Sequence, residues 1–284
     1  MSYNKIVIEQ KIMEFLREDC MFIDISSKVI PEDIETSAKI IAKSSGFVSG
    51  LEELEILYKN LKVNTLFKIK DGDQINKGDI IVELKGNIRD ILLGERIGLN
   101  LMTHMSSITT TARKFVQLIE DSGKSVKIAC TRKTTPGLRI FEKKAAEIGG
   151  ADVHRFSLDD MVLLKDTHLR YYKGDILSLL NNAKANTSFS KKIEIEIEKV
   201  EDILIAAKNG ADIVMLDNMS PDQVEDAINL LKSNNLREKI LVEISGGITQ
   251  ENIVDYLLSE PDIISTGHLT QFPSQKMDFS LRFD

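Results

Sequence analysis

The sequence predicts an α/β protein in which a small mixed α/β segment precedes a barrel or part-barrel of parallel strands. In the first hundred residues, helical patterns alternate with strand patterns, and an Asp-Gly turn at residues 71–72 joins two of the strands as in an antiparallel hairpin. After Gly123, six short apolar runs alternate almost throughout with helical segments, which is typical of a parallel sheet. No glycine-rich dinucleotide fingerprint follows the first run, so a barrel is favoured over an open doubly wound sheet.

The elements of the first segment follow from apolar spacing. Ile8, Ile12 and Phe15 recur on one face of a helix over residues 6–16. The same segment predicts a strand at 38–43, a helix at 51–61, and strands at 65–70 and 79–84. A long helix begins near residue 88, because apolar residues continue at helical spacing as far as Ile119.

The elements of the second segment alternate in type. The apolar runs predict strands at 126–130, 161–164, 193–197, 213–216, 240–244 and 263–264. The helical patterns lie at 138–148, 175–185, 200–208, 221–231 and 251–258.

Composition excludes several classes of protein. Of the 284 residues, 42% are hydrophobic and 29% are charged, which is ordinary for a globular protein. The net charge of −7 argues against nucleic acid as the main partner. Cys20 and Cys130 lie far apart, which argues against a disulfide scaffold and against a cysteine zinc site. No apolar run reaches the length of a membrane span and no signal-peptide pattern is present, so we expect a cytoplasmic protein without membrane association.

A cationic cluster follows the first strand of the second segment. Residues 131–139 read Thr-Arg-Lys-Thr-Thr-Pro-Gly-Leu-Arg, so three cations and three hydroxyls lie within nine residues. Arginine binds carboxylate or phosphate through two parallel hydrogen bonds, and lysine supplies a point charge. The cluster therefore predicts a site for a small molecule that carries several negative charges.

Polar residues also follow the other predicted strands. In a parallel barrel the carboxyl ends of the strands meet at one face, where ligand groups gather. The residues that we expect there are Arg132, Lys133, His154, Arg155, Lys165, Glu196, Asp217, Ser245, Gly246, Gly247, Ser265, Gly267 and His268.

Two subsets of these residues predict a phosphosugar site. Ser245-Gly246-Gly247, expected to open a helix, leaves backbone N–H groups free for an anion, and the helix N-terminus would favour negative charge. Glu196 and Asp217 suit a magnesium ion beside a pyrophosphate, or the hydroxyls of a ribose. Spacing alone does not decide which of Glu194, Glu196 and Glu198 faces the site; Glu194 and Glu198 are alternatives for exposed charges on the opposite face.

The motifs together resemble a known family along nearly the whole chain. They are Gly94-Glu95-Arg96, the run 131–139, His154-Arg155, Leu164-Lys165-Asp166 with His168, Met215–Met219, Glu243–Gly247 and Phe279–Arg282. In this order they resemble the quinolinate phosphoribosyltransferases, which are also called carboxylating nicotinate-nucleotide pyrophosphorylases.

The resemblance implies a fold and a reaction. The fold is an N-terminal α/β sandwich domain over residues 1–108, an open α/β barrel of six parallel strands over 109–269, and a tail of about residues 270–284 that returns to the first domain. The reaction joins quinolinate to phosphoribosyl pyrophosphate with magnesium. It releases carbon dioxide and pyrophosphate and gives nicotinate mononucleotide for NAD biosynthesis.

The resemblance also implies roles for residues. Arg132, Arg155 and Lys165 would hold the quinolinate carboxylates with His154 nearby, and Arg96 would enter from a neighbouring subunit, so a homodimer with shared sites is implied and assembly to a hexamer stays open. The implied catalytic groups are Lys133, Lys165, Glu196 and Asp217, of which Glu196 and Asp217 would also face magnesium. The implied phosphate-binding residues are Ser245, Gly246, Gly247, Ser265, Gly267 and His268.

Several positions depart from the family pattern and leave alternatives open. They include Ala151, Ser157, Thr167 and His268, which would ring the pocket. One alternative is a paralogue of the kind encoded beside molybdate transporters, which acts on another acidic or pyridine substrate; Lys165 argues against it. Another alternative is a non-catalytic regulator that binds a phosphosugar.

Overall fold

The computed structural model describes residues 3–283, which divide into two compact units. The first unit contains the residues up to 113, residues 134–150 and the residues from 272 onward; the second contains residues 114–133 and 151–271. Residues 134–150, which the sequence assigned to the barrel domain, thus group with the first unit. Within residues 3–283, no helix has both the length and the apolar character that crossing a membrane requires.

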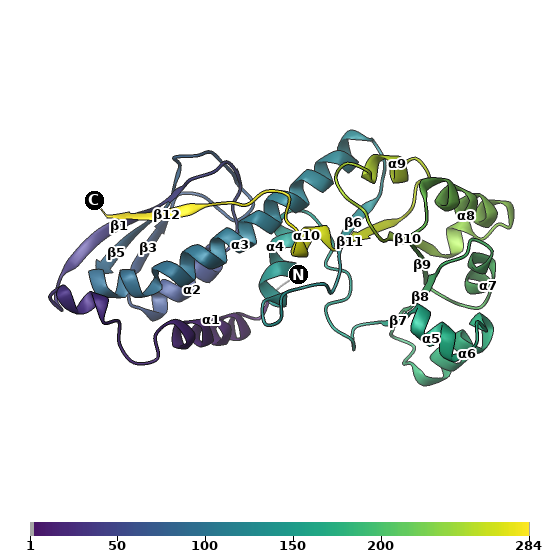
Figure 1. The fold of residues 1–284 in the computed structure, drawn as a ribbon, viewed down its shortest axis with the longest axis horizontal. Coiled ribbons are helices and arrows are strands. Elements are labelled where there is room, and N and C mark those ends of the chain that lie inside the picture. Colours follow the sequence, from purple (N-terminus) through teal and green to yellow (C-terminus); the bar gives the residue numbers. More distant parts are fainter. Residues whose placement is uncertain (1–2, 284) are drawn as a thin grey trace. The chain divides into compact units, whose positions relative to one another are not determined.

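The first unit is built on an antiparallel sheet of four strands in the order β12-β1-β5-β3 (Figure 1). Its strands are β1 Glu35–Ala42, β3 Asn64–Phe67, β5 Ile80–Asn87 and β12 Phe279–Phe283, and a separate pair consists of β2 Gly46–Phe47 and β4 Gln74–Ile75. The predicted antiparallel pairing of β3 with β5 is confirmed. Strand β12 pairs with β1, so the C-terminal tail returns to this sheet as the resemblance implied.

Four helices accompany this sheet. They are α1 Lys5–Asp19, α2 Leu51–Asn60, α3 Ile88–Asp121 and α4 Arg139–Ile148, with a short 3-10 turn η1 at Ser26–Val29. The long predicted helix is confirmed, since α3 begins at Ile88. Two glycines let α3 approach α2: a Cβ at Gly94 would lie 2.8 Å from Tyr58 and one at Gly98 would lie 2.7 Å from Leu54. Only glycine fits at these two crossings without a shift of the neighbouring helix.

A buried ion cluster joins α4 to α2. The Lys144 ammonium, whose side chain is 9% exposed, donates to a carboxylate oxygen of Glu53 at 2.6 Å and to Glu52. The Glu53 side chain is fully buried, and burial raises the pKa of its carboxyl. Removal of one partner from such a pair leaves the other charge buried without compensation.

Replacing Lys144 with methionine should therefore destabilise the protein strongly. We expect a loss of about 3 kcal/mol in the free energy of unfolding, because Glu53 would remain buried without its cation. Denaturant unfolding measures this loss, and the matched control is Lys59→Met, at an exposed position of α2. Equal effects of the two substitutions would contradict the role given to Lys144.

The second unit is built on a sheet of six parallel strands in the order β6-β11-β10-β9-β8-β7. Its strands are β6 Lys127–Cys130, β7 Val162–Leu164, β8 Ile193–Ile197, β9 Ile213–Asp217, β10 Leu241–Ser245 and β11 Ile263–Thr266. The first strand pairs with the last, as in a closed barrel, but β6 and β7 do not pair with each other. The predicted open parallel barrel is confirmed.

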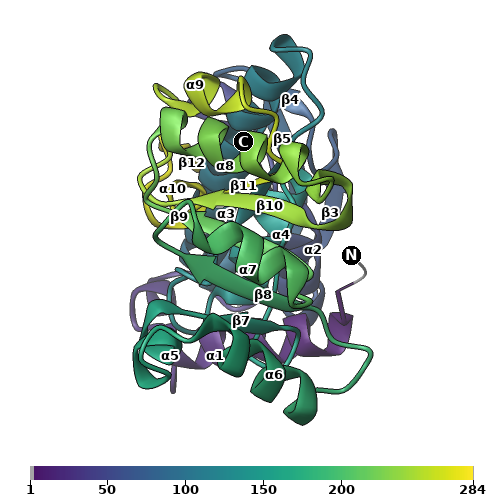
Figure 2. The ribbon, with the colours of Figure 1, turned by 90° about the vertical axis from the view of Figure 1, so that its right-hand side faces the viewer.

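Helices connect these strands along their outer side, and Figure 2 shows α6, α7 and α8 in front of the sheet. They are α5 Asp166–Tyr171, α6 Ile176–Asn186, α7 Asp202–Lys208, α8 Pro221–Ser233, α9 Ile253–Leu257 and α10 His268–Gln271, with a 3-10 turn η2 at Arg237–Lys239. The sequence did not predict α5 or α10. The helix that the sequence predicts over residues 251–258 is shorter than expected, because α9 begins only at Ile253.

Strand alternation decides which side chains face the inside of the barrel. Successive side chains on a strand point to opposite faces. On β8, Ile195 packs in the core while Glu194 and Glu196 share the other face, and Glu196 lies opposite Met215 of β9. Met215 in turn lies opposite Glu243 of β10. The inner face of the barrel thus carries carboxylates on β8 and β10, the two strands that flank β9.

Candidate active site

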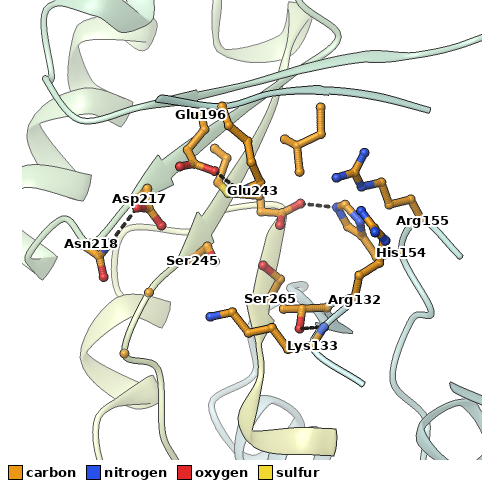
Figure 3. Close-up of a pocket in the computed structure, with 16 residues that line it drawn as sticks. Arg132, Lys133, His154, Arg155, Glu196, Asp217, Asn218, Glu243, Ser245 and Ser265 are labelled. Atoms are coloured by element: carbon orange, nitrogen blue, oxygen red, sulfur yellow. Dashed lines mark hydrogen bonds and ion pairs between the residues drawn. The ribbon is translucent and has the colours of Figure 1, made fainter. Parts of the chain in front are cut away.

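A cavity of about 510 Å³ lies at the carboxyl ends of the six parallel strands (Figure 3). Every residue that lines it belongs to the second unit. The lining residues are Thr131, Arg132, Lys133, His154, Arg155, Leu163, Lys165, Glu196, Met215, Asp217, Asn218, Glu243, Ser245, Gly246, Gly247 and Ser265. The structure therefore brings together eleven of the fourteen predicted site residues in one cavity; Arg96, Gly267 and His268 are outside its lining.

Cationic side chains form one side of the cavity. Arg132 and Lys133 follow β6, while His154 and Arg155 lie in the loop before β7. Arg155 is only 8% exposed, and burial together with the nearby Arg132 charge lowers the pKa of its guanidinium. Two like charges held close together in a poorly hydrated site favour the binding of an anion.

Lys133 is held by its backbone. Its N–H donates to Thr131 Oγ1 at 3.0 Å, and its carbonyl accepts a hydrogen bond from Thr270 Oγ1 at 2.7 Å. Gly267 lies beside the lysine stem, where a Cβ would be 3.1 Å from Lys133 Cδ. Gly267 thus adjoins the site through Lys133, although it does not line the cavity.

Lys165 joins the cationic side to the acidic side. Its ammonium contacts Glu196 Oε2 at 2.7 Å. Its backbone N–H donates to Nδ1 of His168 at 2.9 Å, so His168 caps α5 and orients the lysine.

Carboxylates form the opposite side of the cavity. Glu196 lies on β8, and Asp217 ends β9 with its carboxylate accepting a hydrogen bond from Asn218 Nδ2 at 2.6 Å. Asn218 has a positive φ of 55°, a conformation that asparagine tolerates better than most residues. The carboxylate of Asp217 is thereby fixed by its own chain neighbour.

The loop after β10 provides backbone donors. Gly246 and Gly247 have φ values of 100° and 62°, and within residues 3–283 neither N–H donates a hydrogen bond. The expected contribution of a helix N-terminus is wrong, because five residues separate Gly247 from the short helix α9. Any anion bound here would therefore depend on the loop amides and on Ser245 and Ser265, not on a helix dipole.

Replacing Gly246 with alanine should weaken binding of the phosphosugar. A Cβ there would lie 2.3 Å from Asn218 Oδ1, and the positive φ adds strain, so the loop would have to move. We expect a rise of about 10- to 100-fold in the KM for phosphoribosyl pyrophosphate, the phosphosugar that the resemblance implies. Gly247→Ala is the matched control, because it carries the strain of a positive φ of 62° but its Cβ meets open space, so equal KM changes would contradict the clash proposed at Gly246.

Glu194 and Glu243 are site residues whose roles the sequence did not predict. Glu194 was an alternative for an exposed charge, but it is fully buried because it shares the inner face of β8 with Glu196, while Glu198 is exposed beyond the strand end. Glu243 is also fully buried, and its Oε2 lies 2.8 Å from Nε2 of His154. The two-residue periodicity of β8 was the signal that could have placed Glu194 correctly.

Arg96 belongs to the first unit. Its side chain is largely exposed and pairs with Glu95 at 3.1 Å. It lines two other cavities of that unit, one beside α1 and one beside the segment 19–30.

Comparisons with known proteins agree with this geometry. The family models "Quinolinate phosphoribosyl transferase, N-terminal domain" and "Quinolinate phosphoribosyl transferase, C-terminal domain" match residues 24–106 and 108–282. An Archaeoglobus fulgidus protein named "Probable nicotinate-nucleotide pyrophosphorylase [carboxylating]" is 41% identical over 251 residues, which cover 88% of this chain and 95% of that protein. The human "Nicotinate-nucleotide pyrophosphorylase [carboxylating]" is 32% identical, and the match covers 94% of this chain and 89% of that protein.

Solved structures give the same result. The crystal structure of NadC from Streptococcus pyogenes is similar with a TM-score of 0.90 at 33% identity, covering 100% of this chain and 99% of that one. The nicotinate-nucleotide pyrophosphorylase from Francisella tularensis is similar with a TM-score of 0.91 at 30% identity, covering 100% and 98% of the two chains. The chain therefore belongs to the quinolinate phosphoribosyl transferase family.

Proposed function

We propose that this chain transfers the phosphoribosyl group of phosphoribosyl pyrophosphate to quinolinate and releases carbon dioxide, so that nicotinate mononucleotide and pyrophosphate are formed. The observation that carries the proposal is the cavity at the strand ends, which is lined by four arginine and lysine side chains, three carboxylates and a glycine loop within one volume of about 510 Å³. A dianionic aromatic acid and an activated phosphosugar together match this distribution of charge.

The cationic side would bind quinolinate. Arg132 and Arg155 already lie close enough for their charges to oppose each other, and a dianion between them removes that repulsion. Lys165 and His154 complete this side. Because Arg155 is buried, the carboxylates would lose water on binding, which strengthens each charge-assisted hydrogen bond.

The phosphosugar would lie across the cavity with its 5′-phosphate on the loop of Ser245, Gly246 and Gly247. The pyridine nitrogen forms a bond to ribose C1 as the bond from C1 to pyrophosphate breaks, and the electron pair leaves with pyrophosphate. Lys133 would stabilise the charge that develops on the leaving group, and Glu196 and Asp217 would stabilise the positive charge on the sugar.

The same carboxylates fit a magnesium ion. Glu196 and Asp217 both line the cavity and offer the hard oxygen ligands that magnesium prefers, which is commonly held by one or two carboxylates plus substrate phosphates. When bound, the ion would supply neutralisation of pyrophosphate charge. The present partner of Glu196 is the Lys165 ammonium, so a bound cation would replace this ion pair.

Decarboxylation would follow on the new nucleotide. The positive charge on the pyridine nitrogen draws electrons from C2, the bond from C2 to its carboxylate breaks, and the electron pair stays on C2 until it takes a proton. Arg132, Arg155 and Lys165 would keep the second carboxylate, which is retained, in place. Positioning of the substrates and electrostatic stabilisation would accelerate both steps, without a covalent enzyme intermediate.

The test is an assay of the purified protein with phosphoribosyl pyrophosphate, magnesium and either quinolinate or nicotinate. We expect nicotinate mononucleotide and carbon dioxide in equal amounts from quinolinate. Nucleotide formed only from nicotinate, with no carbon dioxide, would overturn the proposed reaction.

We also propose a homodimer in which Arg96 completes the site of a partner subunit. Arg96 lies beside a strongly exposed apolar segment of the first unit that includes Met21 and Phe22, which are 76% and 91% exposed. Apolar side chains of this size at one surface are typical of a protein interface. A second copy of the chain would cover them and bring Arg96 to an anionic ligand; assembly beyond the dimer remains an expectation.

Mixing two inactive variants tests the shared site. Mixing subunits that carry Arg96→Ala with subunits that carry Lys133→Ala should restore about a quarter of the wild-type activity. Random mixing makes about half of the dimers mixed, and one of the two sites in each mixed dimer would be intact. Co-purification of two tags confirms that mixed dimers have formed. Mixed dimers without recovered activity would contradict a site shared between subunits.

The cytoplasmic location stays a proposal as well. Within residues 3–283, Cys20 and Cys130 are not joined in a disulfide, as a reducing compartment maintains.

A further inference from the structure

His154 lies between the substrate cavity and two buried carboxylates. Its Nε2 is 2.8 Å from Glu243 Oε2 and 3.4 Å from Glu194 Oε2, while its side chain is 11% exposed and lines the cavity (Figure 3). Both carboxylates are fully buried. A ring nitrogen and two carboxylates at these distances must share at least one proton, because three bare acceptors would repel one another.

The backbone fixes this arrangement. His154 has a φ of 52°, in the left-handed region that costs energy for a residue with a Cβ. Its N–H donates to Asp152 Oδ1 at 2.7 Å, which holds the turn. Strain that is retained beside a binding cavity is typical of a residue whose side chain must point in one direction.

The other ring nitrogen, Nδ1, makes no hydrogen bond within residues 3–283. In a neutral ring whose proton is on Nε2, Nδ1 would present a lone pair, which repels a carboxylate. In the doubly protonated ring, Nδ1–H is a charged donor. The two forms therefore have opposite effects on an anionic substrate.

We propose that Glu243, assisted by Glu194, is a positioning residue that keeps His154 doubly protonated, so that Nδ1–H binds the anionic substrate throughout the neutral pH range. This inference rests on the proposed function only for the identity of the anion. Glu243 contributes more than Glu194 to the protonation of His154, because its carboxylate oxygen is nearer to Nε2.

The surrounding charges support this protonation state. Burial by itself would lower the pKa of His154, but the hydrogen bonds and the negative charges of Glu194 and Glu243 outweigh it and raise the pKa to about 10. The other charged groups near the ring are Asp152, which accepts from its backbone, and Arg132 and Arg155, which line the same side of the cavity as His154 in Figure 3. Since an ordinary histidine has a pKa near 6.5, only about 3% of it would be protonated at pH 8.

A metal ion is the competing explanation for this cluster. His154, Glu194 and Glu243 each offer a ligand atom, and these atoms lie within 4.8 Å of one another. The separation of 2.8 Å between Nε2 and Glu243 Oε2 is, however, that of a hydrogen bond that is already formed. The proton thus accounts for the geometry, and metal content becomes an outcome of the test.

NMR titration of the histidine rings tests the inference without any substrate. The chain has four histidines, and the absence of one ring signal from His154→Gln identifies the resonance of His154. We expect the ring to stay protonated from pH 6 to pH 8 in the wild type and to titrate below pH 8 in Glu243→Gln. Titration of wild-type His154 near 6.5, an unchanged titration in Glu243→Gln, or a bound divalent metal that His154→Gln loses would overturn the proposal.

Kinetics separate positioning from mere support of the fold. At pH 8, Glu243→Gln should raise the KM for quinolinate by about 10- to 100-fold, with a much smaller change at pH 6, and should leave the KM for phosphoribosyl pyrophosphate unchanged. Glu243→Asp should restore part of the loss, and Glu198→Gln, at an exposed position after β8, is the matched control. A pH-independent defect in both KM values would indicate a structural role and overturn the proposal. A wild type inactive on quinolinate would reject the proposed function, while the NMR result would still decide this inference.

Discussion

Replacing Lys165 with alanine is expected to lower kcat/KM by about 1,000-fold while the protein stays folded. Lys165 is the only lysine in the described chain whose ammonium pairs with Glu196, and it lines the cavity beside the cationic side chains. Its loss removes a positive charge from the carboxylate site and leaves Glu196 without its partner. The effect should therefore fall on the chemical step and on quinolinate binding together.

Steady-state kinetics measure this effect, and thermal unfolding checks the fold. The Lys165 side chain is 46% exposed, so its truncation should not open a cavity in the core. Lys232→Ala, at an exposed position of α8, is the matched control and should retain wild-type kinetics. An active Lys165→Ala enzyme would remove this lysine from the proposed mechanism.

Replacing Arg155 with methionine is expected to raise the KM for quinolinate by about 100-fold or more. A buried guanidinium that binds a carboxylate through two hydrogen bonds contributes more than an exposed one, because water does not compete for the carboxylate. The KM for phosphoribosyl pyrophosphate should change little, since the glycine loop lies on the other side of the cavity.

The stability of the same variant gives an independent check. Burial and the nearby Arg132 lower the pKa of Arg155, so its charge costs stability in the ligand-free protein. Arg155→Met should therefore bind quinolinate poorly without a loss of melting temperature. Arg155→Lys keeps the charge but not the bidentate geometry, and its KM should lie between those of the wild type and Arg155→Met. A variant that melts early and loses affinity for both substrates would indicate that Arg155 supports the fold instead.

Much of the fold follows from local patterns in the sequence. The six parallel strands lie where short runs rich in apolar residues predict them, because most side chains of a strand that is buried on both faces are apolar. The long helix α3 follows from its apolar spacing over many turns. The grouping of α4 with the first unit has no such signal, since the pattern of an amphipathic helix does not say which surface will cover its apolar face.

The sequence predicted the site residues whose type points to a single chemical role, as arginine and lysine point to the binding of an anion. Arg132, Arg155 and Lys165 line one cavity because the ends of parallel strands meet at one edge. Glu194 and Glu243 were harder to place, because buried carboxylates are rare and their partner His154 lies in a separate loop. The helix expected after Gly247 is present but begins later than predicted, because Thr249 and Asn252 form a turn through their side chains and delay α9.

The most direct measurement is a crystal structure of the protein with benzene-1,2-dicarboxylate, which has the two neighbouring carboxylates of quinolinate but no nucleophilic nitrogen. The central claim is that the cations at the strand ends bind a dianionic aromatic acid. We predict that the carboxylates of the ligand lie against Arg132, Arg155 and Lys165, within hydrogen-bonding distance of His154 Nδ1. A ligand bound elsewhere, or a cavity in which these side chains turn away from it, would contradict the account.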